Sequence, residues 1–554
     1  MALTTDRPTP ARTSLSTAFS SAWLPATLLF LGTLLLYWNT RTAANTFDAV
    51  SYANQIAHLY PRTGDPRWLF HPHHLLFNAL GYVLWSAARA FGFGGGSLVI
   101  LQSLNAVLGA SGVALYYLTL RGLLQRSHGL PLLVSLGLGV SFGYWICATD
   151  GRVNLPSLFL MLAAFSVLTR TLAAPSHKLA ALTGMLAGGA VLLHESAGLF
   201  VIVGLAGVLL AQGPWKQRRL SALTYLGAWG LTAALPYLIV GVGVLHLHSL
   251  SAFHAWSAEY TELGWWWDFR VFHNLGADFY AFRHASFVEP GSRASTFTLA
   301  GRLPALPLGL YVVSVLGWLA AASVILVSLP QLWRSPSRNL ALVMALWVFV
   351  YSAFFTVWSP GYFVFWVPVL VPASTLLALT LAHYRARRGG VVANWLLGVW
   401  VAAYALLNLQ ISILPHLSPQ SDPFRRIAAD VRAHTRSGDV VLVAGAGNGG
   451  PCEVALPYFA DRDVISLHGL LTKTRDDKAA ALGQVQTEIS AVLASGHAVY
   501  ALDDVVPTHS PKTLAALSAK HHLTSEDLTW LLSPYVRTLA WDSPRGPVWR
   551  LTEK

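Results

Sequence analysis

Charged residues are scarce in this chain. Asp, Glu, Lys and Arg together make up 11% of its 554 residues, whereas a soluble globular domain carries about 25%. Hydrophobic residues make up 54%, and the mean hydropathy is +0.50. This composition excludes an ordinary soluble enzyme and predicts a protein that crosses a membrane many times.

Cysteine is scarcer still, with Cys147 in an apolar segment and Cys452 in a polar one. Two cysteines exclude a disulfide framework, and we expect no bridge between them. The N-terminus lacks a compact apolar core followed by a cleavage site, whereas Trp23–Asn39 is long enough to cross a bilayer. We therefore expect residues 1–22 to be a cytoplasmic tail that precedes an uncleaved anchor.

Long apolar segments then recur along the chain, and the short loops between them alternate in charge. Every second loop carries Lys or Arg, and the positive-inside rule makes those loops cytoplasmic. The alternation works only if Leu75–Phe91 does not cross and lies half-inserted in the outer interface. About eleven spans follow. They are expected at 23–39, 98–120, 130–148, 155–169, 179–193, 197–212, 221–245, 306–328, 340–358, 363–382 and 391–413.

This topology predicts a mainly α-helical, polytopic bundle over 23–413, with extracytoplasmic loops at 41–96 and 246–305. The protein is then a multi-pass component of the inner (cytoplasmic) membrane with its N-terminus inside. The formal net charge of +12 becomes a topology signal and an attraction to anionic lipid. Nucleic acid is not expected as a partner.

From about residue 414 the composition changes to that of a small soluble domain. A helical pattern over Phe424–Thr435 is followed by β-rich runs at 440–444, 463–467 and 498–502, with helical stretches between them. Strands that alternate with helices predict an extracytoplasmic α/β domain over 414–554. The glycine-rich run 445–450 fits a dinucleotide-binding pattern, but Pro451 follows it directly, which favours a plain turn.

Polar residues that could take part in catalysis or binding are concentrated in the first outer loop and at the outer ends of later spans. A single interfacial acid would most simply be hydrated by water, and His194-Glu195 could be a paired turn between apolar helices. So many polar groups at outer span ends instead predict one cavity, which suits group transfer from a membrane-anchored anionic donor. They are Asp48, Tyr52, Arg67, His71, His73, His74, Asp150, Arg152, His194 and Glu195.

The run His71-Pro72-His73-His74 also invites a zinc hypothesis. Pro72 constrains the backbone and no Glu lies at a helical ligand spacing, so we expect neither a metal nor a cofactor, with a divalent cation as the alternative. A histidine can instead hydrogen-bond a phosphate, whose charge favours the protonated ring.

The loop 246–305 contains the aromatic run Trp265-Trp266-Trp267, which Asp268 follows. Such tryptophans are typical of an interfacial belt. They could equally form a platform for a sugar ring or a lipid acceptor, with Glu259, Glu262 and Asp268 as acceptor-side acids.

At these residues the chain resembles the GT-C glycosyltransferases, membrane enzymes that use polyprenyl-phosphate sugars, and especially the aminoarabinose transferases and protein mannosyltransferases. The resemblance covers roughly 20–413. It rests on three short motifs: Asp48 to Tyr52 with Gly64-Asp65 and His71-Pro72-His73, then Arg152 to Ser157, then Leu192-Leu193-His194. The chain departs from the family at Ala49, His71, Ser157, His194 and Gly361, where acids, lysines or an arginine are common.

The resemblance implies that Asp48 is the catalytic base, which accepts the proton of an acceptor hydroxyl while the lipid phosphate departs with inversion. Tyr52, Arg67, His71, Arg152 and His194 would then bind the donor phosphate. His73, His74, Asp150, Glu195 and Asp268 would support the site or the acceptor. The expected partners are a polyprenyl-phosphate sugar and a lipid, glycan or protein acceptor.

Two other functions remain open at this point. A transporter or flippase for a lipid-linked sugar would need polar residues near the midplane of several spans, whereas these spans are polar chiefly at their outer ends. A silent relative would bind lipid without turnover, and the departures from the family motifs leave room for it.

Overall fold

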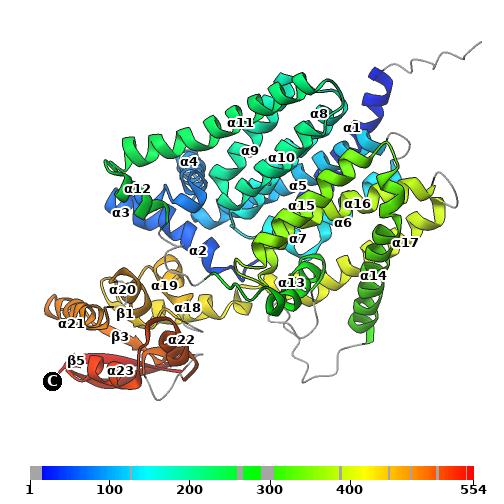
Figure 1. Cartoon of the computed structure of the whole chain (residues 1–554). Helices are drawn as coiled ribbons and strands as arrows, with labels where there is room; N and C mark the ends of the chain where they lie inside the picture. The colour runs from blue at the N-terminus through cyan, green and yellow to red at the C-terminus, as the bar shows by residue number, and fades with distance from the viewer. Residues whose placement is uncertain are drawn as a thin grey trace, which may run out of the picture.

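The computed structural model describes residues 15–124, 128–258, 266–288, 305–385, 390–446, 450–474, 477–506, 511–543 and 546–554. Helices dominate it, and Figure 1 shows a large helical bundle above a smaller domain that contains the sheet and the C-terminus.

Over the residues that the structure describes, the helical bundle contains eight helices long and apolar enough to cross a membrane, together with one bent pair and two shorter apolar helices. They correspond to the eleven apolar segments of the sequence, and the number that actually cross stays a prediction. In chain order they are α1 (Leu15–Asn39), α5 (Ser97–Leu124), α6 (Gly129–Val140) with α7 (Phe142–Thr149), α8 (Asn154–Ala173), α9 (His177–Leu193), η4 (Glu195–Leu199) with α10 (Phe200–Leu209), α11 (Trp215–Leu238) with η5 (Ile239–Val244), α14 (Ala305–Trp333), α15 (Arg338–Phe355), η6 (Phe363–Trp366) with α16 (Val367–Arg385), and α17 (Gly390–Asn408) with η7 (Leu409–Ile413) and η8 (Leu414–Leu417).

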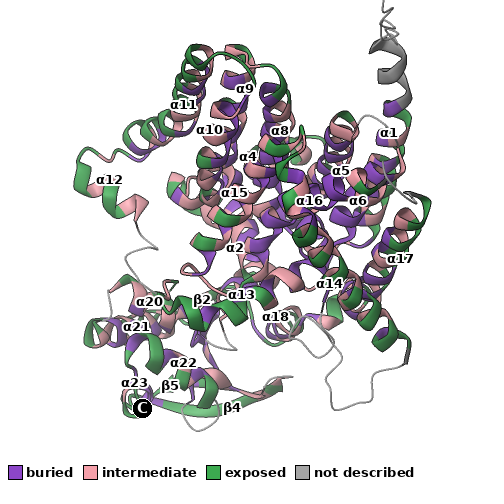
Figure 2. Ribbon diagram, turned by 45° about the vertical axis from the view of Figure 1, so that its right-hand side comes forward, coloured by how far each residue is buried: buried purple, intermediate pink, exposed green. Residues whose placement is uncertain are grey.

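The bundle is packed around buried aromatic rings. Trp347 lies between Phe200 and Phe165, with ring centroids 4.8 and 5.8 Å away. Figure 2 shows buried residues through the centre of the bundle and exposed ones along outer helices such as α11. Apolar side chains on those outer faces, such as Leu231 and Leu235 of α11, suit a hydrocarbon surround.

Between α6 and α7 the chain bends by 62°. The Ser141 hydroxyl donates a 2.6 Å hydrogen bond to the carbonyl of Leu138, at the end of α6. The sequence predicted one continuous segment over 130–148, whereas the structure divides it at this bend into α6 and α7, which run in different directions. Asp150 follows directly after α7.

The first outer loop, named for the side of the membrane predicted for residues 41–96, is built from short helical pieces. They are α2 (Phe47–Asn54), η1 (Gln55–Leu59), α3 (Tyr60–Thr63), η2 (Pro66–Trp68), η3 (Pro72–His74) and α4 (Phe77–Ala90), and the second outer loop contributes α12 (Leu250–Ser257) and α13 (Val271–Ser286). Helix α4 matches the segment expected to lie in the interface rather than to cross. Its 14 residues are too few to span about 30 Å of hydrocarbon at 1.5 Å per residue.

The C-terminal part is an α/β domain, as predicted. Its elements are η9 (Pro419–Ser421), α18 (Pro423–His434), β1 (Val440–Val443), α19 (Cys452–Ala455), η11 (Leu456–Ala460), β2 (Asp463–Ser466), α20 (Leu467–Lys473), α21 (Lys478–Ala494), β3 (Val499–Leu502), η12 (Asp503–Val505), α22 (Pro511–His521), α23 (Ser525–Leu532), β4 (Tyr535–Ser543) and β5 (Gly546–Glu553).

The sheet has the strand order β2-β1-β3-β5-β4. The first three strands are parallel, and β5 runs antiparallel to both β3 and β4. Leu442 packs into the core on one face of the sheet and Val443 into the core on the other, as side chains alternate along a strand. The three parallel strands were predicted from the sequence, and the β4–β5 hairpin was not. Cys147 and Cys452 are both buried and unbridged.

The C-terminal domain docks on the first outer loop, with α19 and η11 against α2. Arg62 pairs with Asp461 and Asp463, at 2.9 Å each. The Tyr458 hydroxyl accepts a 2.9 Å hydrogen bond from the backbone N–H of Leu98, in the first turn of α5. The domain is therefore fastened to the loop that carries Asp48.

Candidate active site

Asp48 lies in the first turn of α2, where the helix dipole favours a carboxylate. The helix begins there because the Thr46 side chain caps it, accepting a hydrogen bond from the N–H of Ala49. Among the described residues no hydrogen bond reaches the Asp48 carboxylate. Burial raises the pKa of Asp48 above its ordinary value, and Asp150 adds to this while Arg152 opposes it.

Asp150 and Arg152 form a buried ion pair beside Asp48, with side chains 2% and 7% exposed. The Nε of Arg152 donates to the Asp150 carboxylate at 3.0 Å, and the Thr46 hydroxyl donates to the same oxygen at 2.6 Å. The amide of Asn105 donates to the carbonyls of Asp150 and Arg152, which fixes the turn between α7 and α8. The pair is therefore rigidly placed.

Tyr362 completes this cluster from the other side. Its hydroxyl accepts a 3.3 Å hydrogen bond from Nη1 of Arg152, and burial raises its pKa. Gly361, with φ of 81°, allows the turn that precedes Tyr362, since this φ is unfavourable for residues with a Cβ. The Nη2 of Arg152 makes no hydrogen bond among the described residues, so it is available to an anionic ligand.

The histidines of the first loop gather with His194 in a second cluster. The ring of His71 stacks on that of His74 at 4.7 Å, and His74 meets Tyr52 edge-on at 4.6 Å. His73 contacts the carboxylate of Glu195 through Nδ1. Burial lowers the pKa of His71 to about 3, that of His194 to about 4, and that of His74 as well. These rings are neutral at pH 7.

The tautomers of two of these histidines follow from their neighbours. Backbone N–H groups donate to Nδ1 of His71, from His73, and to Nδ1 of His194, from Ser196. Because Nδ1 accepts in both rings, the proton of each neutral ring lies on Nε2, which is a hydrogen-bond donor. Within the described part of the chain, no group of three or more His, Cys, Asp or Glu is placed to hold a metal ion.

A narrow cavity lies beside His194 of the second cluster. Both His194 and Phe365 line it, and the ring of Phe365 lies 6.2 Å from that of His194 and 5.3 Å from that of Tyr362. The predicted residues Asp48, Asp150 and Arg152 are therefore brought together, and Tyr52, His71, His73, His74, His194 and Glu195 form the neighbouring group.

Two predicted site residues lie apart from both clusters. Arg67 is exposed in the turn η2. Asp268 pairs with the exposed Arg270 at 2.6 Å, and the hydrogen bonds from Arg270 lower the pKa of Asp268. Their roles stay predictions. Glu259, Glu262 and Trp265 of the same outer loop lie outside the described residues.

Sequence reasoning missed four residues that hold the site. Thr46 and Asn45 contact Asp150, Tyr362 contacts Arg152, and Arg425 of the C-terminal domain donates to Asn45 at 2.7 Å. A helix-capping signal at Thr46 was readable, since Thr precedes the apolar run of α2. Contacts to Arg425 and Tyr362 join residues more than 200 positions apart, which no local pattern shows.

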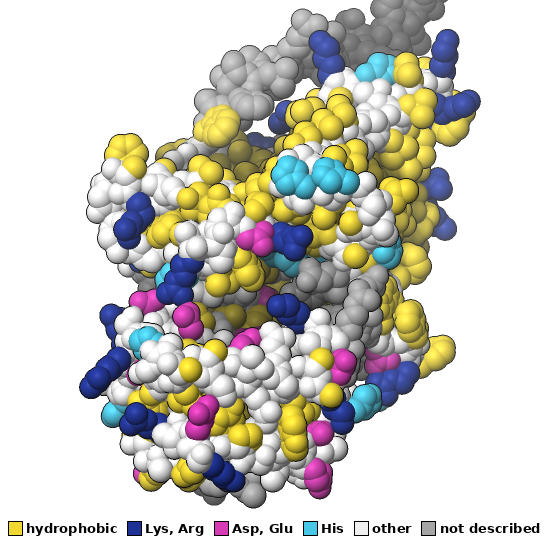
Figure 3. All heavy atoms as spheres, turned by 90° about the vertical axis from the view of Figure 1, so that its left-hand side faces the viewer, with side chains coloured by type: hydrophobic (Ala, Val, Ile, Leu, Met, Phe, Trp, Pro, Cys, Tyr) yellow, Lys and Arg dark blue, Asp and Glu magenta, His cyan; other side chains and the backbone are white. Residues whose placement is uncertain are grey.

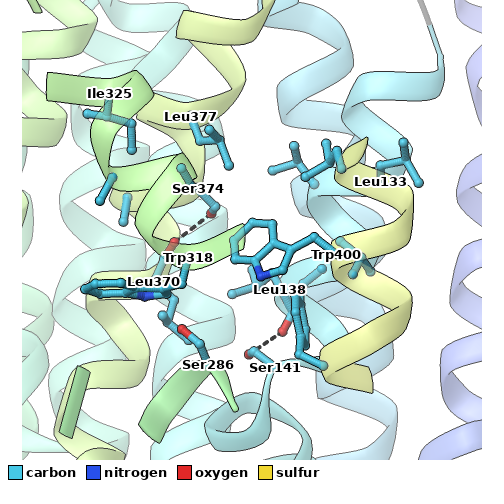
Figure 4. Close-up of a pocket in the computed structure, with 18 of the residues that line it drawn as sticks. Leu133, Leu138, Ser141, Ser286, Trp318, Ile325, Leu370, Ser374, Leu377 and Trp400 are labelled. Carbon is cyan, nitrogen blue, oxygen red and sulfur yellow. Dashed lines mark hydrogen bonds between the residues drawn. The ribbon is translucent and has the colours of Figure 1, made fainter. Parts of the chain in front are cut away.

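An apolar pocket lies among α6, α14, α16 and α17 and contains none of the predicted site residues. Its volume is about 180 Å³, and Trp318, Trp400, Leu133 and Leu377 are among its lining residues. In Figure 4 the lining side chains come from facing helices, and its dashed lines join Ser141 to Leu138 and Ser374 to Leu370. Since the hydroxyls of Ser141, Ser374 and Tyr404 already donate to backbone carbonyls, the pocket suits a hydrocarbon chain rather than the reacting group.

Comparison of the fold with solved structures decides the fold class. ArnT from Cupriavidus metallidurans bound to undecaprenyl phosphate aligns over 97% of this chain and 98% of that one, with a TM-score of 0.56 and 12% identity. The apo state of the same protein aligns over 96% and 98%, with a TM-score of 0.54 and 12% identity. The chain has the GT-C fold.

The GT-C fold was predicted from three short motifs and is confirmed. No family model matches the chain, and no curated protein matches it in sequence. With 12% identity the likeness concerns the fold alone, so the chemistry of this protein must be argued from its own residues. As expected from its apolar helices, it is a multi-pass membrane protein.

Proposed function

We propose that this protein is a membrane glycosyltransferase. It would move a sugar from a polyprenyl phosphate to an acceptor hydroxyl at the outer face of the cytoplasmic membrane. The observation that carries the proposal is the convergence of Asp48, the Asp150–Arg152 pair and Tyr362 from three separate elements. Such a grouping provides a base and a cation within one enclosed place.

In the proposed reaction Asp48 is the general base. The acceptor oxygen attacks the anomeric carbon, its proton passes to the Asp48 carboxylate, and the bond from the anomeric carbon to the phosphate oxygen breaks with its electron pair on the phosphate. Attack opposite to the leaving group inverts the anomeric centre. A raised pKa makes Asp48 a stronger base than an ordinary carboxylate, and such help is worth about 10²–10⁴-fold.

The departing phosphate gains negative charge, and two kinds of group offset it. Arg152 supplies a fixed guanidinium with Nη2 available, and His71 and His194 supply neutral Nε2–H donors. Donors that are already in place cost no reorganisation when charge develops. ArnT, which shares the fold, is known with undecaprenyl phosphate bound, which supports a lipid phosphate as the donor class here.

The transporter hypothesis is less well supported by the same residues. Alternating access needs polar sites near the bilayer midplane, whereas the polar clusters described above lie at helix ends and in the first outer loop. A silent lipid-binding relative would bind the donor and release nothing, so turnover separates it from an enzyme.

The test is release of lipid phosphate by the purified protein from a panel of polyprenyl-phosphate sugars. Wild type is compared with Asp48→Asn, which keeps the size of the side chain, and with Glu526→Gln as a control in the C-terminal domain. We expect Asp48→Asn to lose activity about 10²–10⁴-fold with donor binding retained. If wild type binds donor but never releases phosphate, the enzyme proposal fails.

A further inference from the structure

Helix α13 of the second outer loop carries polar side chains on its buried face and apolar ones on its exposed face. The polar residues of the buried face are Asn274, Asp278 and His284. The large apolar residues of the exposed face are Val271, Phe272, Leu275 and Phe279, with Phe272 91% exposed. The structure describes α13 throughout, and His273 is the one polar residue among its exposed ones. A helix in water has the opposite arrangement, so this pattern predicts that hydrocarbon surrounds the exposed face.

Helix α13 also reaches the middle of a candidate span. The ring of Phe279 meets that of Trp318 edge-on at 5.2 Å, and the ring of Phe282 lies 5.9 Å from the same tryptophan. Trp318 is near the midpoint of α14, which Figure 1 shows beside α13, and only 11% of the apolar window of α14 is buried. Because the midpoint of a span lies in hydrocarbon, the exposed face of α13 continues a surface that lipid covers.

The cation of α13 is directed away from this midpoint. Nη1 of Arg283 donates to the hydroxyl of Tyr311 at 2.5 Å. Tyr311 precedes Trp318 by seven residues, which places it roughly 10 Å nearer the predicted outer end of α14. Long cationic side chains in a membrane extend toward the headgroups in this way. The whole molecule is divided similarly, since Figure 3 shows hydrophobic side chains over much of the bundle and acidic ones mainly on and beside the C-terminal domain.

The buried face of α13 holds the turn that carries Tyr362. The amide of Asn274 donates to the carbonyl of Thr356 at 2.8 Å. Just before α13, the carbonyl of Trp266 accepts a 2.7 Å hydrogen bond from the N–H of Ser359. These two bonds fix the start of the turn.

The turn then continues into the candidate active site. A Cβ added at Gly361 would lie 3.2 Å from that of Ala277 in α13, so the helix and the turn are in close contact there. Tyr362 follows, and its hydroxyl accepts the hydrogen bond from Nη1 of Arg152. A shift of α13 would therefore move the tyrosine that contacts the ion pair beside Asp48.

We propose that α13 is inserted in the outer leaflet of the membrane and that this insertion holds Tyr362 against Arg152. Phe272, Leu275 and Phe279 would lie in lipid hydrocarbon. The occupant of the exposed face is lipid because this face continues the surface of α14. Neither part of the proposal depends on the reaction proposed above.

Insertion is tested by fluorescence quenching in the full chain. A bimane fluorophore is attached to Leu275→Cys in nanodiscs of phosphatidylcholine with brominated acyl chains, and the buried Cys147 and Cys452 should not react. We expect the bromines to quench the fluorophore and iodide in the water to leave it bright, as for Leu231→Cys on the outer face of α11. The control is Thr529→Cys, exposed in the C-terminal domain, which only iodide should quench.

Two results would overturn the insertion. If Leu275→Cys behaves like Thr529→Cys, α13 lies in water. If neither bromine nor iodide reaches Leu275→Cys, a second copy of the chain or another protein covers this face instead of lipid.

The effect on Tyr362 is tested by hydrogen exchange of peptides that cover 356–366, again in nanodiscs. Leu275→Gln has a similar size but a polar end, and it should speed exchange there about five- to tenfold, because apolar burial in lipid is lost. Leu275→Met keeps the apolar contact and should exchange like wild type. Leu231→Gln is the matched control on another outer helix. Equal exchange in Leu275→Gln and Leu275→Met, or the same increase in Leu231→Gln, would refute the coupling of α13 to Tyr362.

Discussion

The contact between Gly96 and Tyr458 gives a sharp prediction about how the C-terminal domain is held. A Cβ added at Gly96 would lie 2.5 Å from the Tyr458 hydroxyl, and 3.5 Å from the ring carbon that bears it. That hydroxyl accepts the N–H of Leu98 at 2.9 Å. Gly96→Ala should therefore displace the hydroxyl and leave this N–H without its partner.

The cost can be worked out from the two terms. Tyr458→Phe removes the hydrogen bond from Leu98, worth about 1 kcal/mol, and a longer one of 3.4 Å with the Ser97 hydroxyl. Gly96→Ala adds a steric clash worth about 1–3 kcal/mol. In the double variant the clashing oxygen is absent, so Gly96→Ala should cost almost nothing more. The two substitutions should thus be coupled by about 1 kcal/mol or more.

Hydrogen exchange of peptides that contain the Leu98 amide measures this locally. We expect exchange about fivefold faster in Tyr458→Phe, up to about a hundredfold faster in Gly96→Ala, and no further increase in the double variant. Gly94→Ala is the matched control in the same turn, because nothing lies within 4 Å of its Cβ position. The reasoning is refuted if Gly96→Ala exchanges like Gly94→Ala, or if the effects of the two substitutions simply add.

Two further predictions concern stability. Burial lowers the pKa of His71 to about 3 and that of His194 to about 4 in the folded protein. Below the ordinary histidine pKa of about 6.5, the unfolded chain therefore binds more protons than the folded one. The stability of the fold is then fully present above about pH 6.5 and falls by roughly 2 kcal/mol per histidine by pH 5; a melting temperature that is flat over this range would contradict the assignment. Asp150→Asn leaves the buried Arg152 without its anion and should lower the free energy of unfolding by about 3–5 kcal/mol, measured by thermal unfolding. Asp268→Asn should lower the melting temperature far less, because its partner Arg270 is exposed to solvent. Equal losses in the two variants would disprove this distinction.

Much of the membrane part was predictable because apolar length leaves few alternatives. A run such as 98–120 in hydrocarbon must form a helix, since only a helix satisfies its own backbone there. The bend at Ser141 was not predictable, because a side-chain hydrogen bond to Leu138 accompanies it within a uniformly apolar segment. In the C-terminal domain β1 was readable from its buried valines and leucine. Strand β4 is mostly exposed and includes Arg537 and Asp542, so its composition lacks the apolar run by which β1 was recognised.

The candidate site was predictable only in its charged members. Asp48, Asp150 and Arg152 stood out because charge is rare next to apolar spans. That these three residues lie close together was an expectation from the topology. In the structure Thr46, which caps the helix that carries Asp48, hydrogen-bonds both Asp150 and Arg152. Asn45 and Tyr362 are ordinary polar residues in sequence, and their importance arises from partners more than 100 positions away.

The docking of the C-terminal domain also has a consequence for the order in which the protein can mature. Tyr458 reaches Leu98 across 360 positions, and Arg425 reaches Asn45 across 380. At about 5–20 residues per second, a ribosome needs roughly 20–70 s after making the first loop before it can make these partners. The spans can insert one by one in that interval while the wall around Asp48 is still missing. A chain in which the C-terminal domain has not yet been made would thus sit in the membrane without the contacts from Arg425 and Tyr458.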